Sequence, residues 1–210
     1  GRVAKHFKHY FDILNIKYSA WDRKNNDISD FDKIFEGCET ILILIKDSAI
    51  EEISKKLIFL NKNLIHFSGS LVTDMAYGVH PLMTFNEDLY NIEVYKNIPF
   101  VADSKDILDK GLLKDIPNKI YFLDKDQKPF YHALCVMGGN FSCILWQRVI
   151  EDFQEKLNLP REILLPYIEQ IFKNILKDEK KALTGPLIRG DDVTIEKNIE
   201  SLYDDSSKRL

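Results

Sequence analysis

The segment that most constrains the fold is Thr40–Ile45, in which a threonine is followed by five consecutive apolar residues. Strand side chains alternate between two faces, so an uninterrupted apolar run is typical of a strand that is buried on both sides of a parallel sheet. A second short run, residues 64–67, stops at a Ser-Gly-Ser turn, and a third spans residues 78–85. We therefore expect an α/β chain whose mostly parallel sheet is covered by helices.

The periodicity of the surrounding residues supports this expectation. Apolar residues recur at helical spacing in residues 2–15, and Asp47 or Ser48 can cap a second helix that reaches Leu60. Residues 16–21 alternate between apolar and polar in the manner of a strand. Two further strands are predicted at residues 99–102 and 119–123, on either side of a helix at 104–113.

The second half of the chain is predicted to be all helical. A polar segment at residues 124–129 precedes one long helix at 130–157, a second that begins with Pro160 as its first residue, and a last one at 193–202. We place the domain boundary in the polar segment. The expected organisation is a Rossmann-like dinucleotide-binding domain, residues 1–127, followed by an all-α domain, residues 128–210.

Composition excludes several classes of function. The formal net charge of -4 provides no basic stripe for nucleic acid. Cys38, Cys135 and Cys143 show no metal-binding spacing, and we expect them to be buried free thiols. We find no apolar run of the roughly 18–20 residues that a membrane span requires. A cytoplasmic protein that binds a small molecule, without nucleic acid or membrane partners, is the expectation.

The amino end resembles part of a cofactor loop. Gly1, Arg2 and Val3 open the first helix and match the back half of a G-x-G-x-x-G/A motif, in which glycine lets the backbone approach a pyrophosphate at the helix N-terminus. The first glycine and the first strand would then lie upstream. The alternative is that Gly1 is an ordinary residue.

A charged pair about 20 residues further on suits the adenosine ribose. Arg23 can pair with a 2′-phosphate and so favours NADP, whereas Asp22 can instead bind the ribose hydroxyls and favours NAD. We expect NADP, with a solvated surface turn as the alternative. Ile45 and Lys46, which end the long apolar run, are also expected to contact the cofactor.

Two strand ends supply the candidate catalytic residues. Ser68 and Gly69 end one strand, and His80 lies before a proline in the next. Ligands bind at the carboxyl ends of parallel strands, and imidazole titrates near neutral pH, so His80 is the candidate for proton transfer and Ser68 for substrate or cofactor binding. The alternatives are a packed histidine and a plain turn.

The helical half offers further candidates. His132, Val136 and Asn140 share one helix face, and Asn140 could donate a hydrogen bond to nicotinamide or substrate. Gly138-Gly139 interrupts this helix and permits close helix packing or, alternatively, the approach of a ligand. Arg189 could bind an anionic substrate group or simply belong to a turn in which Asp191 caps the last helix. His6 and His9 have no third ligand, so we read them as surface residues and expect no metal.

Taken in order, the segments GRVA, WDR, ILILIKD, HFSGS, GVHPLMTF, YHALCVMGGN and ALTGPLIRGD resemble the Rossmann-like NADP oxidoreductases that carry the domain-of-unknown-function 2520 region. These are similar to the class that holds 6-phosphogluconate dehydrogenase, pyrroline-carboxylate reductase and deazaflavin-dependent NADP reductases. The resemblance implies a nucleotide-binding domain, a helical dimerisation domain and a site between them. β-Hydroxyacid dehydrogenases have a lysine one turn before the asparagine, where this chain has Val136, so that mechanism is not carried over.

Together, these features predict an NADP-dependent oxidoreductase that transfers a hydride between nicotinamide and a small, anionic carbonyl or imine compound. His80 would handle the proton, while Ser68 and Asn140 orient the substrate. Arg189 and His132 are weaker candidates for substrate binding. The alternative is a homodimer that binds a nucleotide as a sensor or scaffold without catalysis, because a fold by itself does not imply activity.

Overall fold

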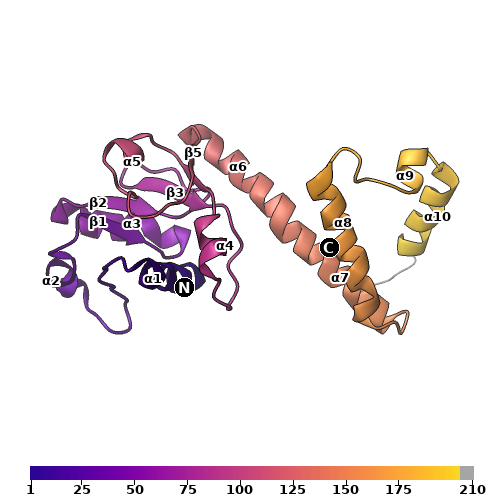
Figure 1. Ribbon diagram of the computed structural model, residues 1–210, viewed down its shortest axis with the longest axis horizontal. Helices are drawn as coiled ribbons and strands as arrows, with labels where there is room; N and C mark the ends of the chain where they lie inside the picture. Colours follow the sequence, from indigo (N-terminus) through magenta and orange to yellow (C-terminus); the bar gives the residue numbers. More distant parts are fainter. Residues whose placement is uncertain (204–210) are drawn as a thin grey trace. The chain divides into compact units, whose positions relative to one another are not determined.

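The structure, a computed structural model, describes residues 1–203 and separates the chain into two compact units that divide after Cys143 (Figure 1). The boundary predicted after residue 127 marks the point where the chain becomes helical, whereas the compact units divide after Cys143. The first unit contains a five-stranded sheet. Its strands are β1 (Thr40–Ile43), β2 (Asn63–His66), β3 (Tyr77–Pro81), β4 (Phe100–Ala102) and β5 (Ile120–Phe122).

The sheet is mostly parallel, as the apolar runs predicted. Its spatial order is β1-β2-β3-β4-β5, with β1, β2 and β3 parallel to one another and β4 and β5 parallel to each other. Only the β3–β4 pair is antiparallel among the described strands. The Rossmann-like α/β class is therefore confirmed.

Helices cover both faces of the sheet, and strand alternation decides which residues each face receives. Helix α1 (Arg2–Leu14) packs on one face, where its Phe7 and Tyr10 join a core that contains Ile65 and Val79. Helices α2 (Phe31–Phe35) and α3 (Asp47–Leu57) belong to the opposite core, which receives the intervening strand residues. Ile41, Ile43 and Leu64 are the strand members of this second core.

Three local predictions were wrong in extent or kind. Residues 16–21 do not form a strand, and no backbone–backbone hydrogen bond joins residues 17–21 to the rest of the described chain. The helix expected at 104–113 is the short α5 (Asp106–Asp109), because Gly111 adopts a positive φ of 60° that ends helical geometry. Pro160 precedes the 3-10 helix η5 (Arg161–Leu164) instead of opening a helix, and the following α8 (Leu165–Lys177) has Pro166 in its first turn.

The shorter elements of the first unit connect these parts. Helix α3 has Lys46 at its N-cap without a side-chain cap, so neither Asp47 nor Ser48 caps it as predicted. Helix α4 (Ile92–Lys96) is capped by Asn91, whose side chain accepts a hydrogen bond from the Val94 amide. The remaining 3-10 segments are η1 (Ile28–Asp30), η2 (Ile58–Leu60) and η3 (Lys125–Gln127).

The predicted long helix is confirmed as a continuous helical stretch that changes type. It consists of α6 (Lys128–Cys135), the π-helical segment η4 (Val136–Phe141) and α7 (Ser142–Glu155). Gly138 and Gly139 lie within the π-helical segment, and a Cβ atom built on either glycine would meet no atom within 4 Å among the described residues. No other helix among the described residues packs closely against this pair, so the explanation by close helix packing stays a prediction.

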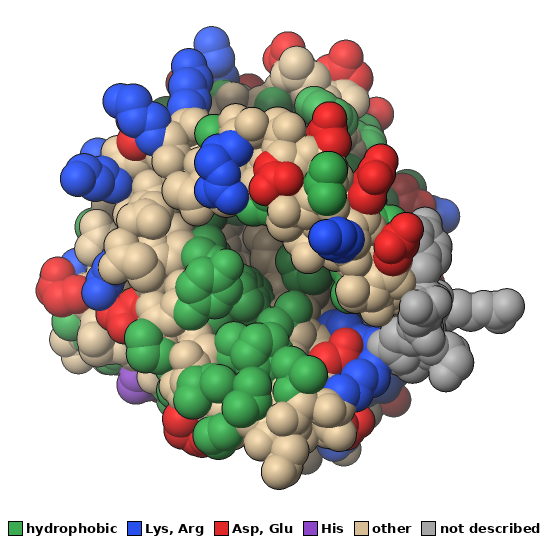
Figure 2. Space-filling model, turned by 90° about the vertical axis from the view of Figure 1, so that its right-hand side faces the viewer, with side chains coloured by type: hydrophobic (Ala, Val, Ile, Leu, Met, Phe, Trp, Pro, Cys, Tyr) green, Lys and Arg blue, Asp and Glu red, His purple; other side chains and the backbone are tan. Residues whose placement is uncertain are grey.

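The second unit contains the end of this stretch with α8, α9 (Pro186–Arg189) and α10 (Asp192–Tyr203). Asp191 caps α10 as predicted, because its carboxylate accepts hydrogen bonds from the backbone amide and the hydroxyl of Thr194. Figure 2 shows hydrophobic side chains gathered around a hollow on the face formed by the C-terminal helices. The most exposed of the described apolar side chains include Leu176, Leu187, Ile188, Val193 and Leu202.

One helical stretch in the described residues, Lys125–Glu155, is long and apolar enough to cross a membrane by length and composition alone. The statement that no run approaches that length was therefore too strict. The criterion is also met by helices of soluble proteins, so it is weak evidence for a span. The three cysteines are free, as expected, but Cys143 is exposed and none of the three is fully buried.

Candidate functional site

The candidate site lies on the sheet face that receives His66, Gly78 and His80. His66 pairs in register with Gly78 across β2 and β3, and side chains two residues apart on a strand point to the same face. His80 therefore lies on the same side as His66, while the intervening Val79 enters the opposite core. Helix α6 packs over this face through Lys128, Tyr131 and His132.

A buried ion pair attaches the first turn of α6 to the sheet. Lys128 Nζ lies 2.8 Å from Asp103 Oδ2, and the two side chains are 4% and 1% exposed. Asp103 also accepts a hydrogen bond from the Gly78 amide at 2.9 Å. A Cβ atom on residue 78 would overlap both Lys128 Nζ and Asp103 Oδ2, so any other residue at this position would displace the ion pair.

His80 is held by a tyrosine from α6. Its Nδ1 lies 2.8 Å from the Tyr131 hydroxyl, and its ring centroid is 5.6 Å from that of His132 in an edge-on arrangement. Burial, followed by a hydrogen bond with Cys135, raises the pKa of Tyr131 above its ordinary value. The phenol therefore stays protonated and can donate its hydrogen to Nδ1; in that tautomer the His80 hydrogen is on Nε2.

Both strand histidines favour the neutral state. Burial is the main cause that lowers the pKa of His80 to about 4, and the neighbouring His132 and Lys128 lower it further. Burial also lowers the pKa of His66 to about 4, and Lys128 adds to the effect, against the opposing charges of Asp103 and Asp47. At neutral pH each imidazole can therefore donate and accept one hydrogen bond without carrying charge.

Ser68 is buried within its own turn. Its hydroxyl donates to Asp47 Oδ2 at 2.5 Å and accepts from the amides of Leu71 at 2.9 Å and Ser70 at 3.3 Å. These bonds use the one hydrogen and both lone pairs of the hydroxyl. The structure thus gives Ser68 a role in joining β2 to α3, and its contact with a substrate stays a prediction.

Two buried histidine nitrogens lack a hydrogen-bond partner among the described residues. They are His66 Nε2 and His132 Nδ1. A Cβ atom on Gly69 would overlap the His132 ring, so this glycine lets the ring approach the turn that follows β2. Buried polar atoms are almost always paired in folded proteins, so two unpaired imidazole nitrogens in one cluster indicate a place where a ligand or water completes the site.

The predicted pyrophosphate site corresponds to the start of α1. Gly1 is the N-cap of this helix, makes no side-chain cap bond, and is followed by no acidic residue in the first turn. Arg2 pairs with Glu87 at 2.8 Å on the surface, and Val3 packs against the core below. The helix N-terminus therefore keeps backbone donors that can face an anion.

The residues predicted to contact the rest of the cofactor are exposed or lie at strand ends. Asp22 and Arg23 lie in an exposed turn, where bonds from the Asn25 side chain and the Lys24 amide lower the pKa of the Asp22 carboxyl. Ile45 and Lys46 lie two and three residues beyond the end of β1, at the carboxyl edge of the sheet. These positions are compatible with the predicted roles, which stay predictions.

The structure does not join Asn140 or Arg189 to this cluster. Asn140 is exposed in η4, nine residues beyond Tyr131, which corresponds to about 13 Å along a helix axis. Arg189 is exposed at the end of α9 in the second unit. Their proposed contacts with a substrate stay predictions.

His6 is a structural residue, contrary to the reading as a surface residue. It is fully buried, and its ring nitrogens bond to the Tyr95 hydroxyl at 2.8 Å and the Asn86 carbonyl at 3.0 Å. Within residues 1–203, no group of three potential metal-ligating side chains is assembled.

Comparison with known families identifies the family of the chain. The family described as "Domain of unknown function (DUF2520)" matches residues 102–210, which is just over half of the chain. The chain belongs to the DUF2520 family. This agrees with the resemblance drawn from the sequence. The matched region contains the end of β4 with Asp103, and all of α6 with Lys128, Tyr131 and His132.

Solved structures share the fold at low sequence identity. A candidate NADP oxidoreductase from Bacteroides fragilis is 22% identical with a TM-score of 0.73, over 99% of this chain and 90% of that one. Pyrroline carboxylate reductase from Plasmodium falciparum, solved with NADP bound, is 18% identical with a TM-score of 0.54, over 99% and 89%. Prephenate dehydrogenase from Aquifex aeolicus is 11% identical with a TM-score of 0.56, over 96% and 94%. No curated protein sequence matches the chain.

Sequence reasoning missed several residues of the cluster. Tyr131 was not predicted, although it lies in an apolar helical segment and three residues before Leu134. His66 could have been found, because it precedes the Ser68 turn by two residues and shares strand parity with a buried face. Lys128 and Asp103 give no local signal, because they lie 25 positions apart in the sequence and only the fold brings them together.

Proposed function

We propose that this protein is an NADP-dependent oxidoreductase that acts on a small carbonyl or imine compound. The observation that carries the proposal is the contact of His80 with Tyr131 at the carboxyl end of β3, within a Rossmann-like unit. Ligands of open α/β sheets bind at this edge. The names of the Bacteroides and Plasmodium neighbours, one a candidate NADP oxidoreductase and the other a reductase solved with NADP, support the choice of cofactor.

The residues at the amino end suit a dinucleotide. The N-terminus of α1 has free backbone donors and no acidic residue in its first turn, so it would favour a pyrophosphate. Arg23 is exposed and could pair with a 2′-phosphate, while the Asp22 carboxylate is already engaged by its own turn. This arrangement supports NADP over NAD. When bound, the nicotinamide would supply the hydride for the reduction.

His80 would orient and protonate the substrate. Because its pKa is lowered to about 4, the ring is neutral at pH 7, and a hydrogen bond donated by Tyr131 to Nδ1 would leave the ring hydrogen on Nε2. The neutral ring can donate a hydrogen bond from Nε2 to a carbonyl oxygen or imine nitrogen. For full transfer of this proton to the substrate, the Tyr131 hydroxyl would pass its own proton to Nδ1, so that the ring stays neutral, and the phenolate would recover a proton from water. General acid catalysis by such a positioned group contributes about 10²–10⁴-fold. An anionic substrate group could be bound by Arg189, which is exposed in the second unit.

We further propose that the helical region forms a homodimer. The stretch Lys125–Glu155 has 19 consecutive uncharged residues, 129–147, and presents Phe130, Met137 and Phe141 to solvent, each more than half exposed. Soluble monomers rarely expose extended apolar surface, and homodimer interfaces are apolar in this way. Light scattering at micromolar concentration should give twice the mass of 24.5 kDa. A particle of the monomer mass would refute dimerisation.

Thermal-shift titrations test the cofactor, because a ligand of the native state must raise its stability. We expect NADPH to raise the melting temperature more than NADH at equal concentration, and Arg23→Ala to narrow this difference. Turnover is tested by following NADPH oxidation with a panel of small 2-oxo acids and cyclic imines. His80→Gln should keep the NADPH-induced shift and lose turnover. A full rate in His80→Gln would show that His80 has no catalytic part.

The structure also favours a second candidate, a nucleotide sensor without catalysis. Its support is that both strand histidines are neutral at pH 7 and that the Ser68 hydroxyl is fully used by the protein. A stabilising NADPH titration with no oxidation across the substrate panel would favour the sensor. Absence of any shift with all four nicotinamide nucleotides would refute both candidates.

A further inference from the structure

The carboxylate of Asp47 lies at the carboxyl edge of the sheet, on the face that receives His66 and His80. Asp47 is the first residue of α3, four residues after the end of β1. His66 has the same strand parity as Leu64, which belongs to the core covered by α3, so this helix and the two histidines share one face. Asp47, Ser68 and His80 are therefore placed at the ends of three neighbouring parallel strands, β1, β2 and β3.

The side chain of Asp47 is exposed, but its position is fixed. Its Oδ2 accepts the hydrogen of the Ser68 hydroxyl at 2.5 Å, and that hydroxyl is itself held by the amides of Ser70 and Leu71. A carboxylate has about four lone-pair sites on its two oxygens. Asp47 therefore keeps acceptor capacity for a ligand while the Ser68 turn holds it in place.

Asp47 differs from the other charged groups near the two strand histidines, because those groups have partners. Lys128 is paired with Asp103 in the buried ion pair, and Lys125 is paired with Asp74 at the surface. In the part of the chain that the structure describes, Asp47 forms no ion pair. Burial lowers the pKa of both histidines, and the charge of Asp47 acts on both rings in the opposite direction. The site thus contains a carboxylate that no cation of the protein compensates.

Such a carboxylate discriminates between the two substrate classes of the proposed reaction. Reduction of a carbonyl group develops negative charge on the oxygen, which a nearby carboxylate opposes. An imine nitrogen instead becomes positively charged when it takes up a proton, and an opposite charge within about 4–6 Å favours that charged form. The N–H of the protonated imine can also donate a charge-assisted hydrogen bond to Asp47.

We propose that Asp47 is a substrate-binding residue and that the substrate is an imine, which is reduced in its protonated form to an amine. This inference rests on the proposed function and specifies its substrate class. The imine nitrogen receives its proton from His80 Nε2, Tyr131 replaces that proton at Nδ1, and the phenolate recovers a proton from water. The new N–H donates to Asp47. The hydride then adds to the carbon, and the electron pair of the C=N π bond becomes the lone pair of the amine nitrogen.

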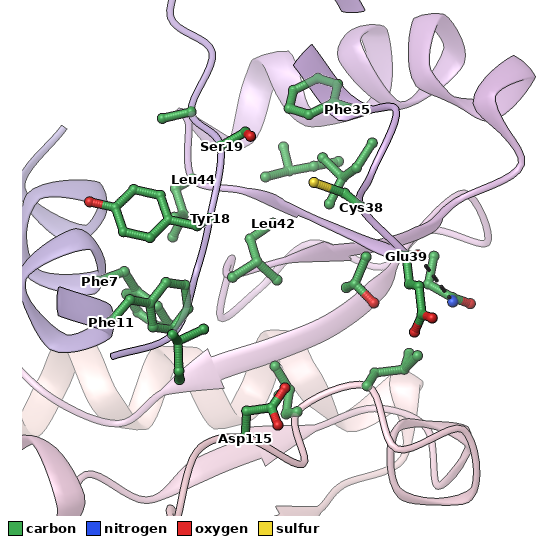
Figure 3. Close-up of a pocket in the computed structure, with 18 of the residues that line it drawn as sticks. Phe7, Phe11, Tyr18, Ser19, Phe35, Cys38, Glu39, Leu42, Leu44 and Asp115 are labelled. Atoms are coloured by element: carbon green, nitrogen blue, oxygen red, sulfur yellow. Dashed lines mark hydrogen bonds between the residues drawn. The ribbon is translucent and has the colours of Figure 1, made fainter. Parts of the chain in front are cut away.

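A second place where a cation could bind is the apolar groove beside β1, which Figure 3 shows. This groove lies between β1 and residues 16–20 and has a volume of about 470 Å³. Two carboxylates, Glu39 and Asp115, are among its lining residues, whereas Asp47, Ser68 and His80 are not. Asp115 therefore provides a control for binding that depends on a carboxylate but occurs away from His80.

Binding is tested on the chain without nucleotide, by NMR titration with piperidinium chloride at low ionic strength. The neutral control probe is tetrahydropyran, which has the same ring size without the charge. We expect piperidinium to shift the amide resonances of Ser68 and Gly69 and the ring resonances of His80, and tetrahydropyran to leave them unchanged. Asp47→Asn keeps an oxygen for the Ser68 hydrogen but removes the charge, so it should weaken piperidinium binding by about fivefold or more.

Matched variants separate the charge of Asp47 from other effects. Asp115→Asn and Asp74→Asn change the net charge of the chain by the same amount and should leave piperidinium affinity unchanged. Asp47→Glu restores the charge and should recover part of the affinity that Asp47→Asn loses. Equal weakening by Asp47→Asn and Asp115→Asn, or equal affinity for piperidinium and tetrahydropyran, would overturn the assignment of Asp47.

Turnover tests the substrate class. With NADPH, we expect oxidation in the presence of the cyclic imine 1-piperideine and little with pyruvate. Asp47→Asn should lower kcat/KM for the imine and keep the NADPH-induced thermal shift. Reduction of pyruvate with no reduction of 1-piperideine would overturn the imine assignment and leave the proposed oxidoreductase in place. Absence of a thermal shift with every nicotinamide nucleotide would instead refute the oxidoreductase and the substrate assignment together.

Discussion

Replacing Lys128 by methionine is expected to destabilise the first unit strongly. The substitution keeps the length of the side chain but removes the ammonium group from a pair whose members are 4% and 1% exposed. Among the described residues, the buried Asp103 carboxylate then keeps the Gly78 amide as its hydrogen-bond partner. Removal of one member of a buried ion pair costs about 3–5 kcal/mol, because the remaining charge loses its compensation.

A matched control is available three residues earlier. Lys125 pairs with Asp74 at 2.7 Å, but these side chains are 40% and 97% exposed. Solvent screens such a pair, so Lys125→Met should cost far less than Lys128→Met. Urea unfolding followed by fluorescence and by circular dichroism gives both free energies. For a chain of this size, the Lys128 loss corresponds to a decrease in melting temperature of roughly 6–20 °C.

The double substitution Lys128→Met with Asp103→Asn separates pairing from packing. If the loss comes from an uncompensated carboxylate, the double variant should be more stable than Lys128→Met alone, and a double-mutant cycle should give a coupling energy of about 1 kcal/mol or more. Equal losses for Lys128→Met and Lys125→Met, or a coupling energy near zero, would refute the reasoning that this pair attaches α6 to the sheet.

Three further predictions concern the same face. Burial lowers the pKa of His66 to about 4, so as pH falls below 6.5 the unfolded chain binds a proton at this residue before the folded chain does. Protonation of His66 should therefore lower the free energy of unfolding of the wild type by about 2 kcal/mol between pH 7 and pH 5. Urea unfolding of His66→Asn should show a pH dependence that is smaller by this amount. Gly69→Ala must displace the His132 ring, which should cost about 1–3 kcal/mol and shift the ring resonances of His132 in NMR spectra, whereas unchanged resonances would contradict the contact. Tyr131→Phe should reduce kcat on the order of tenfold with KM unchanged if the proposed reaction is correct, while an unchanged kcat would remove Tyr131 from the mechanism.

The sheet could be predicted from the sequence because its strands have clear local sequence signals. Five apolar residues in succession identify β1, and the turn residues after His66 end β2. The failure at residues 16–21 has the opposite cause. That segment has the alternation of a strand, but a strand exists only when a partner satisfies its backbone, and here the adjacent groove is open.

The candidate site could be predicted only in part. His80 was found because a titratable side chain stands at a strand end, where ligands bind. Its partner Tyr131 lies 51 residues away and depends on the packing of α6, which periodicity cannot supply. Ser68 was correctly located in a turn, but only the contacts with Asp47 and Leu71 reveal that its hydroxyl is already saturated.

Gly78 helps to specify the register in which β3 pairs with β2. Strand pairings can slip by one residue, and each slip moves every side chain to the other face. In the observed alignment the one residue without a side chain faces the Lys128–Asp103 pair. A slip in either direction would bring Tyr77 or Val79 against these charges and leave them without room to meet. A chain with β3 shifted by one residue would thus lose both the ion pair and the attachment of α6. The absence of a Cβ atom at residue 78 therefore favours the observed register over the two registers that differ from it by one residue.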